Sequence, residues 1–308
     1  MTISKILGWL VIFTTLTGFL LMAASAHAET ASGDVVGKIQ YYTVQPEDTL
    51  YAVARRFDIG IVDIMAANPG VDLWVPDPGT VLTLPTMYVL PPVKHEGIVI
   101  NLSELRLFYF PDPHTVVTFP IGIGRDGWET PVGTTTIVEK RKNPIWTPPD
   151  SIRADNPDLP NFIPAGPDNP LGDYAMNLGW SGYLLHGTNR PYGIGRRSSH
   201  GCIRLYPEDI EKLFNAVKEG TVVTVIDSPY KLGWRKNTLF LEITPTQIQT
   251  DSIAEHKPLD IQDIPKLYGD IRQLAGTAQI DWRAVRDAVM WRNSIPIAIA
   301  YRENIASQ

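Results

Sequence analysis

The sequence predicts a mainly β protein that contains a small strand–helix–helix–strand module and ends in a helical segment. Proline accounts for 26 of the 308 residues, and proline interrupts helix interiors but is tolerated in turns, loops and edge strands. Runs of β-forming residues dominate residues 97–228, whereas helical spacing of apolar residues is concentrated in residues 48–67 and 261–291. We therefore expect a β-rich core with helices on either side of it in the sequence.

Length and composition exclude several classes of protein. The chain is 44% hydrophobic and 19% charged, which excludes a disordered, collagen-like or coiled-coil protein. A length of 308 residues predicts roughly two domains. The net charge of −6 argues against general nucleic-acid binding, so we expect no nucleic-acid partner. Cys202 is the single cysteine, so no intramolecular disulfide forms.

The first 28 residues have the pattern of a secretory signal peptide. Lys5 provides a positive charge, residues 6–22 are mostly apolar, and Ala26 and Ala28 supply the small residues of a cleavage site. An uncleaved membrane anchor is the alternative, because the apolar run approaches a spanning length. The pattern predicts export to the periplasm and cleavage after Ala28.

Residues 40–85 have the pattern of a self-contained unit. We expect a strand at Gln40–Val44, a helix with Asp48 as its N-cap that ends at Gly60, a second short helix stopped at Asn68, and a strand at Val81–Leu84. This order is strand, helix, helix, strand.

The remaining chain divides into a linker, a β-rich domain over residues 97–228 and a C-terminal extension over residues 229–308. Tyr88–Val93 is expected to be a stiff linker because of its prolines. The extension is expected to continue as extended chain to about Thr250 and then to form helices at Ile261–Leu274 and Trp282–Trp291; we assign it no role. In the β-rich domain we expect strands at Ile98–Leu102, Leu105–Phe110, Val116–Ile123, Thr134–Val138, Ala175–His186 and Thr221–Ile226, and a helix at Pro207–Val217.

A proline-rich stretch, Asn143–Pro170, interrupts the β-rich domain. A long irregular segment inside a compact domain is more often functional than accidental. It is expected to form a lid over a site or to be an inert insertion.

The segment from Leu185 to Leu205 carries the chemistry. The free cysteine, Cys202, lies close in sequence to His186 and His200 and among four arginines, and no Asp or Glu occurs between Tyr174 and Pro207. Such surroundings favour thiolate over thiol and a substrate that carries carboxylates. A cysteine with a histidine within hydrogen-bond reach is a candidate nucleophile. Two alternatives remain open: Cys202 is a buried packing residue, or Cys202, His186 and His200 ligate zinc.

Residues 40–85 resemble a LysM module. The matching residues are Tyr42-Thr43-Val44, Asp48-Thr49-Leu50, Ile64 to Pro69 and Pro78-Gly79-Thr80. The resemblance implies binding to the N-acetylglucosamine-containing glycan of peptidoglycan or chitin, with the turns at Asp48-Thr49 and Asn68-Pro69 as candidate contacts. A packing domain without a ligand is the alternative.

His186-Gly187-Thr188 together with Ser199-His200-Gly201-Cys202-Ile203-Arg204 resembles the signature of L,D-transpeptidases with a YkuD-type catalytic domain, a β-sandwich. Gly122, Gly124 and the stretch 164–170 resemble the ErfK/YbiS subgroup. The resemblance implies that Cys202 is the nucleophile and His186 its base, that the Gly187 carbonyl orients the imidazole, and that backbone N–H groups near Gly201 and Cys202 form the oxyanion hole. Ser199, His200 and Arg204 would shape the pocket or hold a donor carboxylate.

The expected function is that of a periplasmic peptidoglycan L,D-transpeptidase with no cofactor and no metal. The resemblance implies that Cys202 forms a thioester with meso-diaminopimelate of a stem tetrapeptide, releases D-alanine and passes the acyl group to an amine. That amine is the terminal lysine of an outer-membrane lipoprotein or a second diaminopimelate, and water as acceptor would make the enzyme an L,D-carboxypeptidase. A non-catalytic LysM anchor and a zinc amidase are the rival functions. Carbapenems acylate many enzymes of the resembled family.

Overall fold

The computed structural model describes residues 29–30 and 33–302. The predicted signal peptide, residues 1–28, lies outside these residues. Within the described residues, no helix is both long and apolar enough to cross a membrane.

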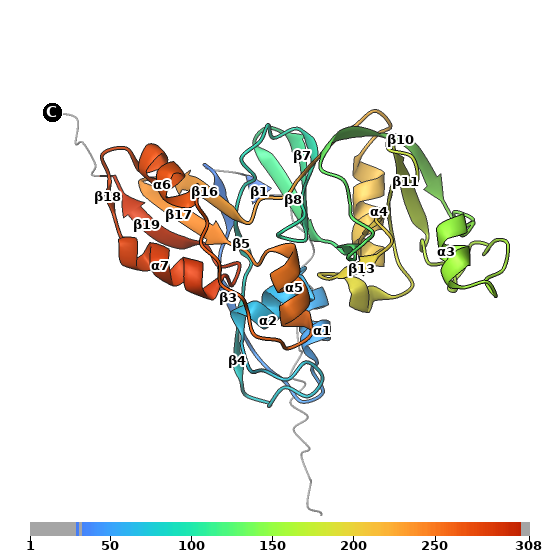
Figure 1. Ribbon diagram of the computed structural model, residues 1–308, viewed down its shortest axis with the longest axis horizontal. Helices are drawn as coiled ribbons and strands as arrows, with labels where there is room; N and C mark the ends of the chain where they lie inside the picture. Colours follow the sequence, from blue (N-terminus) through green and yellow to red (C-terminus); the bar gives the residue numbers. More distant parts are fainter. Residues whose placement is uncertain (1–28, 31–32, 303–308) are drawn as a thin grey trace, which may run out of the picture.

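The β-rich domain that carries the transpeptidase-like motif, hereafter the catalytic domain, is built on one mixed sheet, and the prediction of a mainly β fold is confirmed (Figure 1). In the described chain the strand order is β1-β8-β7-β6-β15-β10-β11-β12-β14, and a second small sheet pairs β9 with β13. The apolar face of α4 packs on β11 and buries Ile210 and Leu213 in the domain core. The strands are β1 Glu29–Thr30, β6 Gly97–Asn101, β7 Arg106–Asp112, β8 Thr115–Pro120, β9 Ile123–Gly124, β10 Gly133–Lys142, β11 Tyr174–Leu178, β12 Leu184–His186, β13 Arg197–Ser199, β14 Ile203–Arg204 and β15 Val222–Ile226; the helices are α3 Asp150–Asp155, the 3-10 turn η1 Pro191–Gly193 and α4 Pro207–Ala216.

The LysM module forms the predicted strand–helix–helix–strand unit. Its elements are β3 Gln40–Thr43, α1 Leu50–Arg56, α2 Ile61–Ala67 and β4 Val81–Leu84, with β3 and β4 antiparallel. The N-cap of α1 is Thr49, whose hydroxyl accepts from Ala52 N at 3.0 Å, and not Asp48 as the sequence suggested. One residue separates the two candidates, and only the backbone conformation distinguishes them.

The expected linker at Tyr88–Val93 is instead part of the folded core. Strand β5, Met87–Val89, pairs with β2, Val35–Gly37, and Tyr88, Val89 and Leu90 are buried. The partner strand comes from residues that the sequence analysis left unassigned. The LysM module is therefore not joined to the catalytic domain by an exposed spacer.

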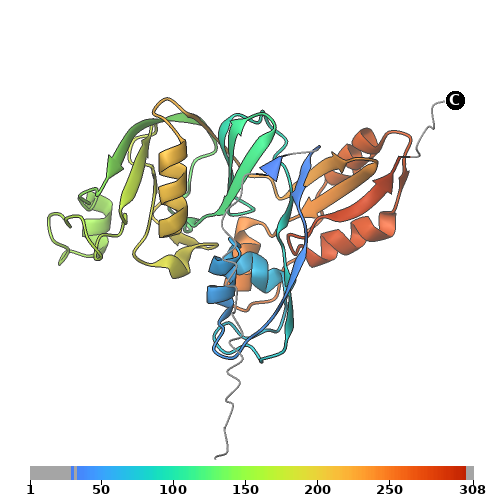
Figure 2. The same cartoon turned by 180° about the vertical axis from the view of Figure 1, so that it is seen from behind.

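Most of the C-terminal extension folds into an α/β unit at the end of the molecule opposite α3, whereas its helix α5, Gln247–Ala254, packs against α2 of the LysM module (Figures 1 and 2). The two predicted helices are present, and Asp281 caps the second one through Arg283 N and Ala284 N. Strands β16 and β17 fall where extended chain was expected, but the four-stranded sheet β16-β17-β19-β18 and helix α5 were not predicted. The sheet depends on the pairing of β19 with β17, which is distant in sequence. The elements are β16 Tyr230–Arg235, β17 Thr238–Ile243, α5 Gln247–Ala254, α6 Leu267–Ala275, β18 Gln279–Ile280, α7 Trp282–Trp291 and β19 Ile297–Tyr301.

Buried polar contacts hold the three units in fixed positions. Lys231 of the C-terminal unit bonds Glu104 of the catalytic domain at 2.6 Å and its own unit's Glu242 at 3.1 Å, and all three are buried. Asp63 on α2 accepts from the hydroxyl of Ser294 at 2.9 Å. Arg106 of β7 is fully buried and donates to the carbonyl of Asp58 in the LysM module at 3.1 Å. Because buried charges are costly unless paired, these contacts favour a single arrangement of the units.

Candidate active site

His186 and Cys202 lie at the ends of two neighbouring strands, His186 within the first strand and Cys202 just before the second. Strands β12 and β14 are parallel, with Leu185 opposite Ile203 and His186 opposite Arg204. His186 is the last residue of β12, and Cys202 immediately precedes β14. Both side chains line one cavity of about 330 Å³. The parallel pairing thus brings together two residues that are 16 positions apart.

Cys202 is a free thiol in a partly buried position. Its Sγ lies 3.6 Å from the carbonyl oxygen of Gly182, to which the thiol donates. Burial raises the pKa of Cys202, although a backbone hydrogen bond from Leu184 and the positive charge of Arg204 oppose the rise. The resting side chain is therefore a thiol at neutral pH.

His186 is buried with its imidazole held by backbone oxygen. Nδ1 lies 2.6 Å from the Gly187 carbonyl oxygen, and the residue is 3% exposed. Burial, with a smaller contribution from Arg204, lowers the pKa of His186 to about 3, although the carbonyls of Gly187 and Leu171 favour the protonated ring. A proton on Nδ1 satisfies the Gly187 carbonyl and leaves Nε2 as an acceptor, which is the form a general base requires.

The expectation of a thiolate stabilised by an arginine-rich field is wrong. Desolvation outweighs the nearby positive charge in the pKa of Cys202. The fold also supplies carboxylates that the local sequence lacks: Asp155 lies 3.6 Å from Arg125, and Asp251 lies 2.5 Å from Arg197. A raised thiol pKa and a lowered imidazole pKa favour neutral thiol and neutral imidazole, so attack by sulfur then requires transfer of the thiol proton to a base.

Alkylation of Cys202 tests this assignment. Iodoacetamide reacts with thiolate, so its rate should rise with pH and have a midpoint above the value of about 8.5 for a free cysteine. Arg204→Gln should raise the midpoint further, because Arg204 lowers the pKa of the thiol. Intact mass against time at each pH measures the rate. A midpoint at or below about 8.5 in the folded protein would support the thiolate instead.

Two hydroxyls hold the loop that carries the nucleophile. Ser199 Oγ donates to the Cys202 carbonyl at 2.6 Å, and Thr130 Oγ1 donates to the Gly201 carbonyl at 2.8 Å. Ser199 is 1% exposed, so it stabilises the loop through this buried hydrogen bond. Thr130 was not identified from the sequence, because it lies 72 residues before Cys202 and has no motif of its own.

Gly201→Ala should disrupt this loop. Gly201 has φ +98°, and a Cβ there would lie 2.9 Å from Cε1 of Tyr183. We expect a loss of about 1–3 kcal/mol of stability and a large loss of turnover, because the nucleophile must move. Gly220→Ala is the matched control: Gly220 has φ +85° but open space around it, so it incurs backbone strain alone. Thermal unfolding and turnover of both variants measure the difference, and equal effects would contradict a special role for Gly201.

His200 forms part of the cavity wall. Its ring packs edge-on against Trp128 with centroids 4.7 Å apart, and its Nε2 lies 3.1 Å from Nη2 of Arg125. Partial burial and the charges of Arg125 and Arg204 lower its pKa. It lines both the cavity of Cys202 and an adjoining cavity of about 550 Å³.

Arg204 lies where the two cavities meet. It lines both of them, and its Nη1 reaches the Ser198 carbonyl at 3.5 Å. Its Nε is buried without a hydrogen-bond partner among the described residues. Because an unpaired buried donor is costly, a substrate oxygen is a favourable partner for this guanidinium.

The proline-rich stretch Asn143–Pro170 forms a wall of both cavities, as expected for a lid and not for an inert insertion. Trp146 and Ile152, the latter on α3, line both cavities, and Ile145 and Ser151 add to the one that holds Cys202. The side chain of Asn169 makes four hydrogen bonds that fix the end of the stretch in place. The shortest runs from its Nδ2 to the Pro144 carbonyl at 2.7 Å.

Two arginines of the segment that precedes Cys202 have partners in other units. Arg197 of β13 is buried and pairs with Asp251 on α5, so the C-terminal unit contacts the strand that leads into the catalytic loop. The guanidinium of Arg196 lies 5.6 Å from the ring centroid of Tyr51 in the LysM module. The sequence analysis missed both contacts because the partners lie in other units.

The zinc alternative requires Cys202, His186 and His200 to converge. Among residues 29–30 and 33–302, no group of three or more His, Cys, Asp or Glu side chains is arranged to hold a metal ion. The three residues line one cavity without forming such a group.

Comparison with known proteins identifies two regions of the chain. The family profile of the L,D-transpeptidase catalytic domain (YkuD) matches residues 95–225, and that of the LysM domain matches residues 42–85. In Escherichia coli (strain K12), the protein named "Probable L,D-transpeptidase YcfS" is 38% identical over 94% of this chain and 94% of its own length. "Probable L,D-transpeptidase ErfK/SrfK" is 44% identical over 86% of this chain and 87% of its own length. "Probable L,D-transpeptidase YbiS" is 39% identical over 88% of this chain and 90% of its own length.

These similarities extend well beyond the catalytic motif, since they cover the LysM module and most of the C-terminal unit. The two matched domains point to a protein that binds peptidoglycan outside the cytoplasm. With a buried histidine at the end of one strand and a free cysteine just before its parallel partner in a YkuD-type domain, this chain belongs to the L,D-transpeptidase family.

Proposed function

We propose that Cys202 and His186 catalyse acyl transfer from a peptidoglycan stem tetrapeptide through a thioester. The observation that carries the proposal is that His186 at the end of β12 and Cys202 just before β14, the parallel partner of β12, line one cavity. Attack by sulfur on the carbonyl of meso-diaminopimelate passes the thiol proton to Nε2 of His186. The tetrahedral intermediate then collapses, the C–N bond breaks, and D-alanine leaves with that proton.

The second half of the reaction regenerates the enzyme. An amine attacks the thioester carbonyl, His186 accepts the amine proton, and the Cys202 sulfur leaves and is reprotonated. Backbone N–H groups near Gly201 and Cys202 would stabilise both oxyanions. The unpaired Nε of Arg204 supports a role in holding a carboxylate of the donor stem.

The acceptor amine is the terminal lysine of an outer-membrane lipoprotein or a second diaminopimelate. The resemblance to the ErfK/YbiS subgroup favours the lipoprotein. Mass spectrometry of muropeptides from cells with and without the gene separates the outcomes: loss of lipoprotein-linked stems supports the lipoprotein, loss of 3-3 dimers supports cross-linking, and loss of trimmed tripeptides alone supports an L,D-carboxypeptidase. Unchanged muropeptides would contradict the proposed function.

Export to the periplasm through a cleaved signal peptide at residues 1–28 belongs to the same proposal. The apolar run and the Ala26-x-Ala28 site support it. N-terminal sequencing of protein isolated from cell envelopes should begin at Glu29. A chain that retains Met1 would support the membrane anchor.

A purely anchoring function is less well supported. A non-catalytic spacer has no need for a buried histidine that shares a cavity with a free cysteine. Turnover of a soluble tetrapeptide by the purified chain distinguishes an enzyme from an anchor.

A further inference from the structure

Two of the four LysM residues expected to contact sugar, Asp48 and Asn68, make hydrogen bonds within the module itself. The carboxylate of Asp48 accepts from the hydroxyl of Tyr42 at 2.6 Å, from Gln45 N at 2.9 Å and from Arg56 at 3.1 Å. Asn68 is buried and makes two hydrogen bonds with the backbone of Thr83. These two side chains stabilise the module. Of the four expected contacts, Thr49, which lines the cavity between the domains, and the exposed Pro69 remain accessible to a ligand.

Three aromatic rings from two domains cluster beside the LysM module. Tyr51 at the start of α1 contacts Trp74 of the α2–β4 loop with ring centroids 4.9 Å apart, and it contacts Tyr192 of η1 in the catalytic domain at 5.1 Å. Trp74 and Tyr192 also contact each other at 5.8 Å. Although the rings touch, Trp74 remains 55% and Tyr192 58% exposed. Rings that served only to hold the domains together would be expected to be buried, whereas a cluster left open indicates a binding surface.

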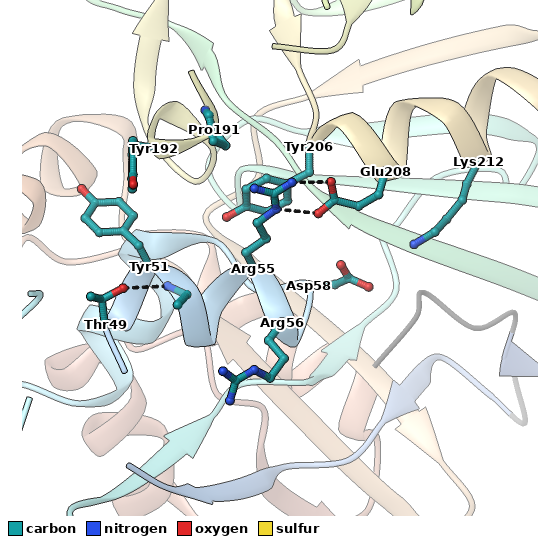
Figure 3. A pocket seen from close by; sticks show the side chains of 11 residues that line it. Thr49, Tyr51, Arg55, Arg56, Asp58, Pro191, Tyr192, Tyr206, Glu208 and Lys212 are labelled. Carbon is teal, nitrogen blue, oxygen red and sulfur yellow. Dashed lines mark hydrogen bonds and ion pairs between the residues drawn. The ribbon is translucent and has the colours of Figure 1, made fainter. Parts of the chain in front are cut away.

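A cavity of about 600 Å³ begins at this cluster and runs between the domains. Figure 3 shows Tyr51 and Tyr192 at one end, Lys212 at the other, and the Arg55–Glu208 ion pair between them. Both hydrogen bonds of that pair are 2.7 Å long. Flat aromatic faces beside hydroxyl and charged groups suit a saccharide, because its C–H faces are apolar and its hydroxyls need partners.

The loop that carries Tyr192 also borders the catalytic cavities. Arg190 lines the cavity of about 550 Å³ that adjoins the Cys202 cavity, while the next two residues line the interdomain cavity. Further along the loop, the backbone of Gly195 packs so closely on the LysM module that a Cβ would lie 2.3 Å from Ile61 N. The two cavities are thus on either side of one loop, and that loop is fixed to the LysM module.

We propose that Tyr51, Trp74 and Tyr192 form a composite saccharide site that binds the glycan strand across the LysM–catalytic domain boundary. A strand held there would present its stem peptides across the loop toward the cavities that adjoin Cys202. The idea that Tyr192 helps to present stem peptides to the catalytic cavities rests on the proposed function. Saccharide binding by Tyr192 can be measured independently of that function. Holding glycan and stem on one rigid body raises the effective concentration of the stem at the catalytic site.

Calorimetric titration of the purified full-length protein with a β-1,4-linked N-acetylglucosamine hexamer tests the site. Tyr192→Ala and Tyr192→Leu should each weaken binding roughly tenfold, since both remove the flat ring, and Tyr192→Phe should bind as wild type does. Tyr41→Ala is the matched control, because Tyr41 is 72% exposed on the same module and makes no ring contact with the cluster. Thermal unfolding of each variant verifies its fold.

The outcomes separate this proposal from the proposed function. Wild-type affinity in Tyr192→Leu, or no hexamer binding by the wild type, would overturn the composite site even if the wild type turns over a soluble tetrapeptide. Weakened binding in Tyr192→Leu with an inert wild type would support the site and refute the function. Weakened binding only for Trp74→Ala would restrict saccharide contact to the LysM module and overturn the role of Tyr192.

Discussion

Replacing Cys202 by alanine is expected to lower turnover of a stem tetrapeptide by at least about a thousandfold, because no other group can form the thioester. Intact-mass spectra of the wild type with a carbapenem should show one covalent adduct, and those of Cys202→Ala should show none. The side chain forms no disulfide and its thiol donates a single, long hydrogen bond of 3.6 Å to the Gly182 carbonyl, so the variant should fold and unfold much as the wild type does.

The control for this experiment is the thermal unfolding of Cys202→Ala. An adduct that persists on a folded Cys202→Ala would assign the nucleophile to another residue. Residual turnover within about tenfold of wild type would exclude a thioester on Cys202 as the route of the reaction.

His186→Ala is expected to lower turnover by about 10²–10⁴-fold, which is the usual contribution of a general base. The pH profile adds a sharper test. Because the folded pKa of His186 is lowered to about 3, the imidazole stays neutral as the pH falls through the ordinary histidine value of about 6.5. The acid limb of kcat/KM should therefore lie well below that value, and wild-type kcat/KM should stay nearly constant between about pH 7 and pH 5.

His200→Ala is the matched control for His186→Ala. His200 lines the same cavity but contacts Trp128 and Arg125 and not the Gly187 carbonyl. Its removal should cost less turnover than removal of His186 and should leave the acid limb unchanged. An equal or larger loss in His200→Ala would transfer the role of base to His200, and a wild-type acid limb near about 6.5 would mean that the base is not desolvated.

The candidate site illustrates how far local sequence can predict chemistry. The identities of Cys202 and His186 as the nucleophile–base candidates follow from a free cysteine beside histidines in a recognisable motif, and the structure brings the two to one cavity. The electrostatics could not be predicted in the same way. The segment around Cys202 contains no Asp or Glu, but Asp155 pairs with Arg125 and Asp251 pairs with Arg197 in the folded protein. Burial also raises the pKa of the Cys202 thiol.

The fold shows the same division. The strand–helix–helix–strand module was predictable because its turn residues and apolar spacing are local, and both C-terminal helices were predictable for that reason. The buried pairing of β5 with β2 and the sheet that contains β19 were not, because each depends on a partner strand far away in the sequence.

The sequence by itself determined the family, the domain types and the two residues proposed for the chemistry, since these depend on residue identity and short-range spacing. Only the tertiary structure decided the protonation of Cys202 and His186, the lid contributed by Asn143–Pro170 and the aromatic cluster shared by Tyr51 and Tyr192. Desolvation, charge pairing and ring contact all fall off over a few ångströms, so they depend on which distant segments the fold brings side by side.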